Sequence, residues 1–111
     1  MNTRGSRTCD ILTGMTDLIT VVAVMKAKPG KEAELRAAAL AIVEPTRNEK
    51  GCVQYDLHVH LTDPGSIVFY ENWASAEDLD RHGEAPHLVA FRAIVGDLTE
   101  SRNVERFRRI A

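Results

Sequence analysis

The pattern of apolar and polar residues predicts four strands and two helical regions along the chain. Residues 18–28 are apolar on both alternating faces, which is typical of a strand that is covered on both sides. Residues 31–50 carry apolar side chains at helical spacing. Pro45 is expected to kink or locally unwind this helix because it removes one backbone donor, and Gly51 is expected to end it.

The next two strands, residues 52–61 and 67–73, flank a turn at 62–65 and therefore predict a β-hairpin. Alternation along the first of these strands separates a polar face from an apolar one. The apolar face is expected to carry Val53, Tyr55, Leu57, Val59 and Leu61.

The register of this hairpin decides which side chains share a face. In one register, Leu61 lies opposite Ser66. His58 then lies opposite Phe69 and points to the same face as Glu71. A single bulge reverses that direction, and the sequence leaves both arrangements open.

The third strand leads into the stretch that holds most of the candidate chemistry. Alternation there points Glu71 to the same face as the aromatic side chains of Phe69 and Trp73. A serine N-cap with an acidic residue in the N3 position then starts a first helical segment. A glycine after a histidine breaks it, and a proline suits the first turn of a second segment. The residues with these roles are Ser75, Asp78, His82, Gly83, Pro86, His87 and Phe91.

A loop at 96–98 and a last strand at about 102–110 complete the chain. Basic residues alternate imperfectly with apolar ones in this strand, as is typical of a sheet edge. The order β-α-β-β-α-β predicts an α+β, ferredoxin-like fold, in which both helical regions pack on one face of an antiparallel sheet. The other face of 18–28 is then apolar and uncovered, so we expect a homodimer joined sheet to sheet.

Length indicates a single domain, residues 18–111, preceded by a flexible arm at 1–17 that lacks core-forming periodicity. The net charge of −2 gives no electrostatic basis for binding nucleic acid or an anionic membrane surface. The longest apolar run, 19–25, is too short to cross a bilayer. Cys9 and Cys52 suit reduced thiols better than a disulfide, so a cytoplasmic location is expected.

A series of segments carries a family resemblance. They are residues 19–21, 26–31, 45–47, 51–58 and 69–73, followed by Ser75, Leu79, His82, Pro86, His87 and Phe91. Together they resemble the antibiotic biosynthesis monooxygenase superfamily, in particular its quinol-monooxygenase-like branch. The resemblance covers about 18–110 and implies a dimeric α+β barrel with a pocket between sheet and helices in each subunit.

The resemblance implies a cofactor-independent monooxygenase that oxidises a quinol or related phenol with dioxygen. Such a protein needs a base, an apolar pocket and donors for the developing oxyanion. Relatives with the same fold isomerise a small phosphorylated sugar-like signal or degrade haem, so the fold alone does not define the reaction. Two alternatives stay open: a non-catalytic protein that binds a small aromatic, and an isomerase of a small carbonyl compound.

Glu71 is the leading candidate for the catalytic base, since desolvation among aromatic rings is expected to raise its pKa toward neutrality. His58 is the second candidate if the hairpin register brings it to the same face. Each candidate also has a structural interpretation, as an ion-pair partner, a core residue or a helix-end partner. The residues expected to wall the pocket or orient substrate oxygens are Phe69, Trp73, His82, His87 and Phe91.

A metal site is the competing interpretation. His58 and His60 lie on one predicted strand face, and Glu71 would complete a two-histidine, one-carboxylate set. A His-x-His pair is common by chance, and the family resemblance offers no counterpart for His60 as a ligand. We therefore expect no bound metal and no other cofactor.

Overall fold

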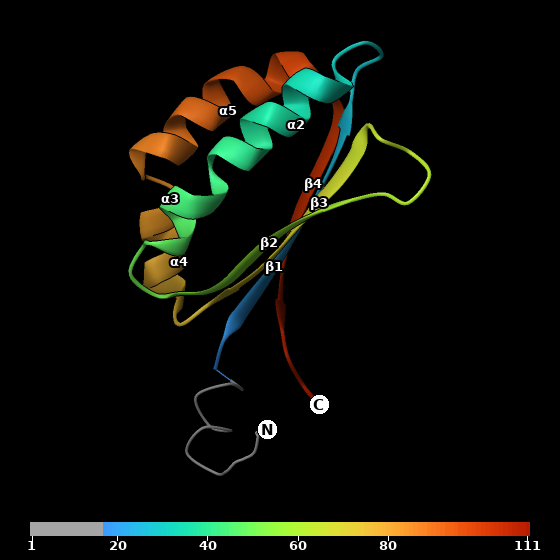
Figure 1. Ribbon diagram of the computed structural model, residues 1–111. Coiled ribbons are helices and arrows are strands. Elements are labelled where there is room, and N and C mark those ends of the chain that lie inside the picture. The colour runs from blue at the N-terminus through green and yellow to red at the C-terminus, as the bar shows by residue number, and fades with distance from the viewer. Residues whose placement is uncertain (1–16) are drawn as a thin grey trace.

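The computed structural model describes residues 17–111, so the predicted arm lies outside the described residues except for Asp17. The elements follow in the predicted order (Figure 1): β1 (Ile19–Ala27), α2 (Glu32–Ala41), α3 (Val43–Arg47), β2 (Cys52–Val59), β3 (Ser66–Trp73), α4 (Ala76–His82), α5 (Pro86–Leu98) and β4 (Thr99–Arg108). Over residues 17–111, no helix has the length and hydropathy needed to cross a membrane.

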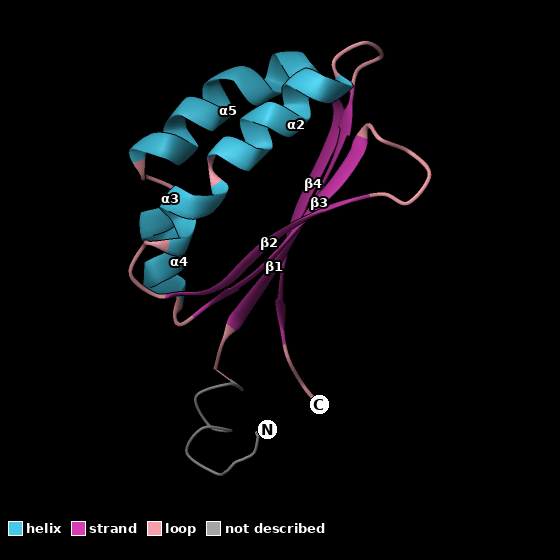
Figure 2. Cartoon of the chain, viewed as in Figure 1, coloured by secondary structure: helices cyan, strands magenta, loops and turns pink. Residues whose placement is uncertain are grey.

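The four strands form one antiparallel sheet in the order β2-β3-β1-β4, so β2 and β4 are its edges. The helices cover one face of this sheet (Figure 2). This is the predicted α+β, ferredoxin-like arrangement. The core lies between the two layers, where alternate residues of β1 and β3 meet the apolar sides of α2 and α5. Its buried members include Val21, Ala23, Leu35, Ala39, Ile67, Phe69, Trp73, Phe91 and Val95.

The first helical region is interrupted at Ile42, between α2 and α3, as its proline predicts. Pro45 lies in the middle of α3 and has no N–H to donate to the carbonyl of Ala41, four residues earlier. Gly51 does not end the helix, because α3 has already ended; it occupies a turn before β2 with φ +83°. A Cβ there would overlap the side chain of Asp78, so the approach of this turn to α4 requires glycine.

The predicted loop at 96–98 and the predicted start of the last strand near 102 are wrong. α5 continues to Leu98, and β4 begins at Thr99. Gly96 is tolerated inside α5 because it lies on the exposed side, while Val95 and Leu98 bury the opposite side. The Thr99 hydroxyl donates to the Val95 carbonyl oxygen at 2.8 Å, which satisfies one acceptor at the helix end.

The hairpin register differs by one residue from the one that pairs Leu61 with Ser66. Tyr55 lies opposite Glu71, and His58 lies opposite Val68. His58 is therefore exposed on the outer face of the sheet, and the expectation that it shares a pocket with the carboxylate is wrong. Of the residues expected on the apolar face, two pack against the core, Tyr55 and Leu57, whereas three are exposed, Val53, Val59 and Leu61.

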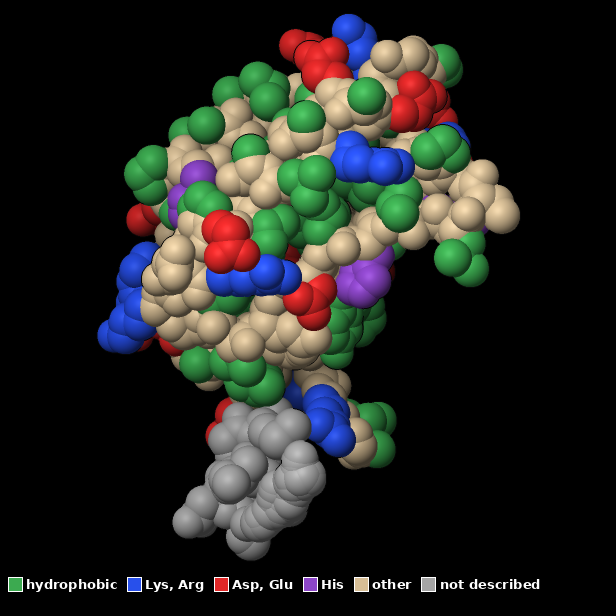
Figure 3. All heavy atoms as spheres, in the orientation of Figure 1, with side chains coloured by type: hydrophobic (Ala, Val, Ile, Leu, Met, Phe, Trp, Pro, Cys, Tyr) green, Lys and Arg blue, Asp and Glu red, His purple; other side chains and the backbone are tan. Residues whose placement is uncertain are grey.

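The outer face of the sheet carries no helix within the described chain and is partly apolar. Val24, Tyr70 and Phe107, on the adjacent strands β1, β3 and β4, are 41%, 38% and 49% exposed there. Figure 3 shows another side of the molecule, where basic and acidic side chains of the described residues are interspersed and form no continuous basic area. The described part of one chain thus leaves an apolar sheet face uncovered, as the element order predicts.

Candidate functional site

A cavity of about 280 Å³ lies between the sheet and the helices. Side chains from both layers form its largely apolar wall, among them Val21, Met25, Phe69, Leu88, Phe91 and Val95. Three buried polar side chains also face it: Tyr55, Glu71 and His82. The exposed lining residues belong to α5 and β4, so the cavity opens between this helix and the edge strand; they include Arg92, Arg102, Val104 and Arg106.

Glu71 points from β3 into the cavity and is 5% exposed. Burial raises its pKa from 4.5 to about 7. The indole N–H of Trp73 donates to Glu71 Oε1 at 2.9 Å and opposes that shift, whereas the charge of Glu49 adds to it. As the sequence predicts, this is a poorly solvated carboxylate, and it exchanges a proton near neutrality.

The three aromatic residues expected to wall the pocket divide into two groups. Phe69 and Phe91 line the cavity and meet edge to face, with ring centroids 6.2 Å apart. Trp73 is fully buried and lies outside the lining. The centroid of its ring lies 4.6 Å from that of His82, and its indole N–H donates to Glu71. Trp73 therefore contacts both His82 and Glu71 without lining the cavity itself.

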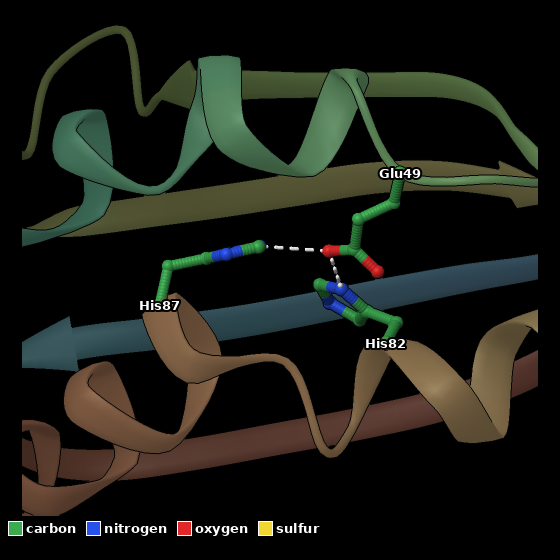
Figure 4. A group of neighbouring side chains, drawn as sticks. All are labelled: Glu49, His82 and His87. Atoms are coloured by element: carbon green, nitrogen blue, oxygen red, sulfur yellow. Dashed lines mark hydrogen bonds and ion pairs between the residues drawn. The ribbon is translucent and has the colours of Figure 1, made fainter.

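The two histidines expected to orient substrate converge on a third residue (Figure 4). His82, the last residue of α4, and His87, in the first turn of α5, both contact Glu49 in the turn between α3 and β2. The Glu49 Oε2 atom lies 2.7 Å from His82 Nδ1 and 2.7 Å from His87 Nε2. Burial lowers the pKa of His82, and Glu49 opposes that effect in part. Only His82 of this group lines the cavity.

Glu49 and the arginines of β4 are not among the site residues predicted from the sequence. Glu49 lies 33 residues from His82 and 38 from His87, and no periodic pattern relates positions that far apart. Arg102 and Arg106 lie opposite inward-facing residues of β1. Their alternation is visible in the sequence, but only the assembled sheet shows that this side faces a cavity.

Glu49, His82 and His87 are also the group within residues 17–111 that could hold a metal ion, since one ligand atom of each lies within 4.8 Å of the others. Imidazole and carboxylate ligands suit zinc or iron. The two 2.7 Å separations are hydrogen-bond distances, however. They are shorter than the roughly 3.3 Å between neighbouring ligands of a tetrahedral zinc ion. The geometry therefore matches a hydrogen-bonded group more closely than a coordination shell.

The other metal set, of His58, His60 and Glu71, is not assembled. His58 lies on the outer face of the sheet, whereas Glu71 faces the cavity. His60 lies in the hairpin loop, where its Nδ1 atom accepts the backbone N–H groups of Thr62 and Asp63, each at 3.1 Å. That interpretation is wrong because the register separates its members.

Comparison with known proteins agrees with the fold. The model of the family "Antibiotic biosynthesis monooxygenase" matches residues 18–94. The chain is 39% identical over 84 residues to Rv0793 of Mycobacterium tuberculosis, covering 76% of this chain and 82% of that protein. It is 33% identical over 95 residues to "Probable quinol monooxygenase YgiN" of Escherichia coli, covering 75% of this chain and 90% of that protein.

Solved structures agree with these matches. PA3566 from Pseudomonas aeruginosa superposes with a TM-score of 0.83 at 31% sequence identity, covering 87% of this chain and 98% of that one. Rv0793 superposes with a TM-score of 0.80, covering 85% and 96%. The chain therefore belongs to the antibiotic biosynthesis monooxygenase family.

Proposed function

We propose that this protein is a monooxygenase that oxidises a quinol or a related phenol with dioxygen and without a bound cofactor. The observation that supports this most directly is the buried carboxylate of Glu71 in an aromatic-walled cavity, where its pKa is about 7. A base with that pKa can take a phenolic proton near neutral pH. The name of the relative YgiN, a probable quinol monooxygenase, supports the same substrate class.

Deprotonation is the step that makes such a substrate reactive, because a phenolate gives up an electron to dioxygen more readily than a phenol does. Glu71 accepts the phenolic proton. A ring carbon then forms a bond to one oxygen atom, and the O–O bond breaks. The second oxygen atom leaves as water with two protons. A hydroquinone and dioxygen thus give a hydroxyquinone and water; the ring supplies all four electrons, so no external reductant is needed.

The size and charge of the cavity also suit this substrate class. Its volume of about 280 Å³ favours a compact substrate of one or two aromatic rings, since ligand pockets commonly measure roughly 300–1,000 Å³. Phe69 and Phe91 provide the aromatic wall. Arg92, Arg102 and Arg106 bring positive charge to the opening, where it stabilises an anionic oxygen.

The experiment measures oxygen consumption with a panel of benzene and naphthalene hydroquinones in metal-free buffer, corrected for uncatalysed oxidation. Glu71→Gln keeps the shape of the side chain and removes the base, so turnover should fall by ~10²–10⁴. His58→Ala is the matched control, because His58 is exposed on the outer face and should leave turnover unchanged. A stable Glu71→Gln variant with unchanged turnover and pH–rate profile would show that the carboxylate is structural.

One observation favours a second candidate, an isomerase of small carbonyl compounds. Two proton-carrying groups, Glu71 and His82, face the same cavity, which is the arrangement that proton shuttling between adjacent carbons needs. Incubating small hydroxyketones with the protein in deuterated water under argon tests this candidate. Exchange of a carbon-bound hydrogen that depends on Glu71, with no oxygen consumption on the hydroquinone panel, would favour isomerisation. Ligand-induced quenching of Trp73 fluorescence without any turnover would indicate a binding protein.

A further inference from the structure

Glu49 bridges the two histidines beside the cavity (Figure 4). Its Oε2 atom lies 2.7 Å from both His82 Nδ1 and His87 Nε2, and its side chain is 14% exposed. An ionised carboxylate accepts hydrogen bonds and donates none. His82 Nδ1 and His87 Nε2 therefore both donate to this carboxylate, so His82 carries a proton on Nδ1.

The second ring nitrogen of His82, Nε2, is not the one that contacts Glu49. His82 lines the cavity, and within residues 17–111 its Nε2 atom has no hydrogen-bond partner and is not among the fully buried unpaired atoms, so it is accessible. Burial lowers the pKa of His82, which favours the neutral ring. A neutral imidazole with its proton on Nδ1 has its lone pair on Nε2. A proton acceptor is thus available at the cavity wall.

We propose that Glu49 is a positioning residue, which holds His82 in the Nδ1–H tautomer and makes His82 Nε2 a second proton acceptor beside Glu71. His87 holds the Glu49 carboxylate from the other side with its own hydrogen bond. The catalytic part of this inference rests on the proposed function, whereas the tautomer depends on no substrate.

Two acceptors match the chemistry of a quinol, which has two hydroxyl groups. Glu71 takes one hydroxyl proton and His82 Nε2 takes the other. Both protons leave in the water that forms from the second oxygen atom of dioxygen. Trp73 connects the acceptors, because its indole N–H binds Glu71 while its ring lies 4.6 Å from that of His82. The two groups are therefore held by one rigid, fully buried neighbour.

The tautomer is tested without substrate by long-range ¹H–¹⁵N correlation spectra of the ¹⁵N-labelled protein at neutral pH. We expect His82 to show a protonated Nδ1 and an unprotonated Nε2. Glu49→Ala should move the proton to Nε2, the commoner tautomer of a free imidazole, whereas Glu49→Gln retains an acceptor oxygen and should preserve Nδ1–H in part. Glu44→Ala is the control, since the Glu44 side chain pairs with Arg47 on the exposed side of α3, and its loss should leave the His82 signals unchanged.

The positioning role is tested by kinetics with a quinol that the wild type oxidises. Glu49→Ala and His82→Gln should each lower kcat by ~10² with little change in KM, as expected for loss of an oriented proton acceptor. Because Glu49 acts through His82, the double variant should be no slower than the slower single variant. A residue that only stabilises the fold would instead add its own loss to that of His82→Gln.

Three results would overturn the proposal. The first is an Nε2–H tautomer of His82 in the wild type, and the second is fully additive losses of kcat in the double variant. The third is loss of the His82 Nδ1–H and His87 Nε2–H signals when Zn²⁺ is added at stoichiometric concentration, which would identify a metal site. A failure of the proposed function looks different. In that case no hydroquinone is oxidised, yet the tautomer and its dependence on Glu49 are still observed.

Discussion

Glu71 has a pKa of about 7 in the folded protein, compared with 4.5 for a solvated glutamate. A raised pKa means that the folded protein binds this proton more tightly than the unfolded chain does. Folding is therefore favoured while the carboxyl is protonated, and that advantage is lost as the pH rises from about 4.5 to about 7. The burial that makes Glu71 a base near neutrality thus lowers the free energy of unfolding above pH 7.

Replacing this one residue should change how stability depends on pH. When the pH rises from 5 to 8, the free energy of unfolding of the wild type should fall by roughly 2 kcal/mol more than that of Glu71→Gln, which has no titrating side chain at position 71. Urea unfolding followed by Trp73 fluorescence at both pH values measures the difference. Glu44→Gln, which removes a carboxylate with 76% of its side chain exposed, should instead follow the wild type. Parallel pH dependences for the wild type and Glu71→Gln would contradict the raised pKa.

Among the structural elements, α4 is linked to the site through its last residue, His82, which lines the cavity. α4 is only seven residues long, and so short a helix depends on its capping and packing. Ser75 Oγ accepts the backbone N–H of Asp78 at 3.1 Å and donates to its Oδ2 atom at 2.9 Å. Arg81 donates to the other oxygen of that carboxylate at 2.7 Å. These contacts define where α4 begins.

Removing the cap should weaken the whole domain. Ser75→Ala leaves the Asp78 N–H without its acceptor and should lower the free energy of unfolding by ~1 kcal/mol. Ser75→Thr keeps a hydroxyl and should lose less. Urea unfolding at pH 7 measures both variants, with Ser101→Ala on the exposed side of β4 as the control. If Ser75→Ala cannot be distinguished from that control, the cap does not contribute to stability.

At the scale of the whole molecule, residues 17–111 cover one side of the sheet with helices and leave the other side without any. The helices bury the inner face, while Val24, Tyr70 and Phe107 remain partly exposed on the outer face. Burying such apolar surface against a second copy is favourable, and a two-fold axis lets the same face serve on both partners. The outer face is therefore where we expect a homodimer to form.

Light scattering at micromolar concentration should give twice the mass of one chain. Tyr70→Glu places a charge in the expected contact and should shift the protein toward monomer. Leu40→Glu is the matched control, because Leu40 is an exposed apolar residue on α2 and should leave the dimer intact. A monomeric mass for the wild type would exclude this assembly at that concentration.

Several features were predictable because their signals are local. The alternation of β3 places Glu71 on the face of Phe69 and Trp73, and that period of two depends only on neighbouring residues. The Ser75 cap and the break at Gly83 are likewise encoded within a few positions. The order of elements, and with it the α+β fold, follows from such signals taken together.

Contacts between distant residues were decided by the tertiary structure. A slip of one residue turns every side chain of a strand to the other face, and burial of Tyr55 against the helical layer selects the register that exposes His58. Glu49 meets His82 and His87 because the turn before β2 packs beside α4 and α5, a contact across 33 and 38 residues. Local periodicity does not predict this contact, because it forms only when the helices pack on the sheet around a common core.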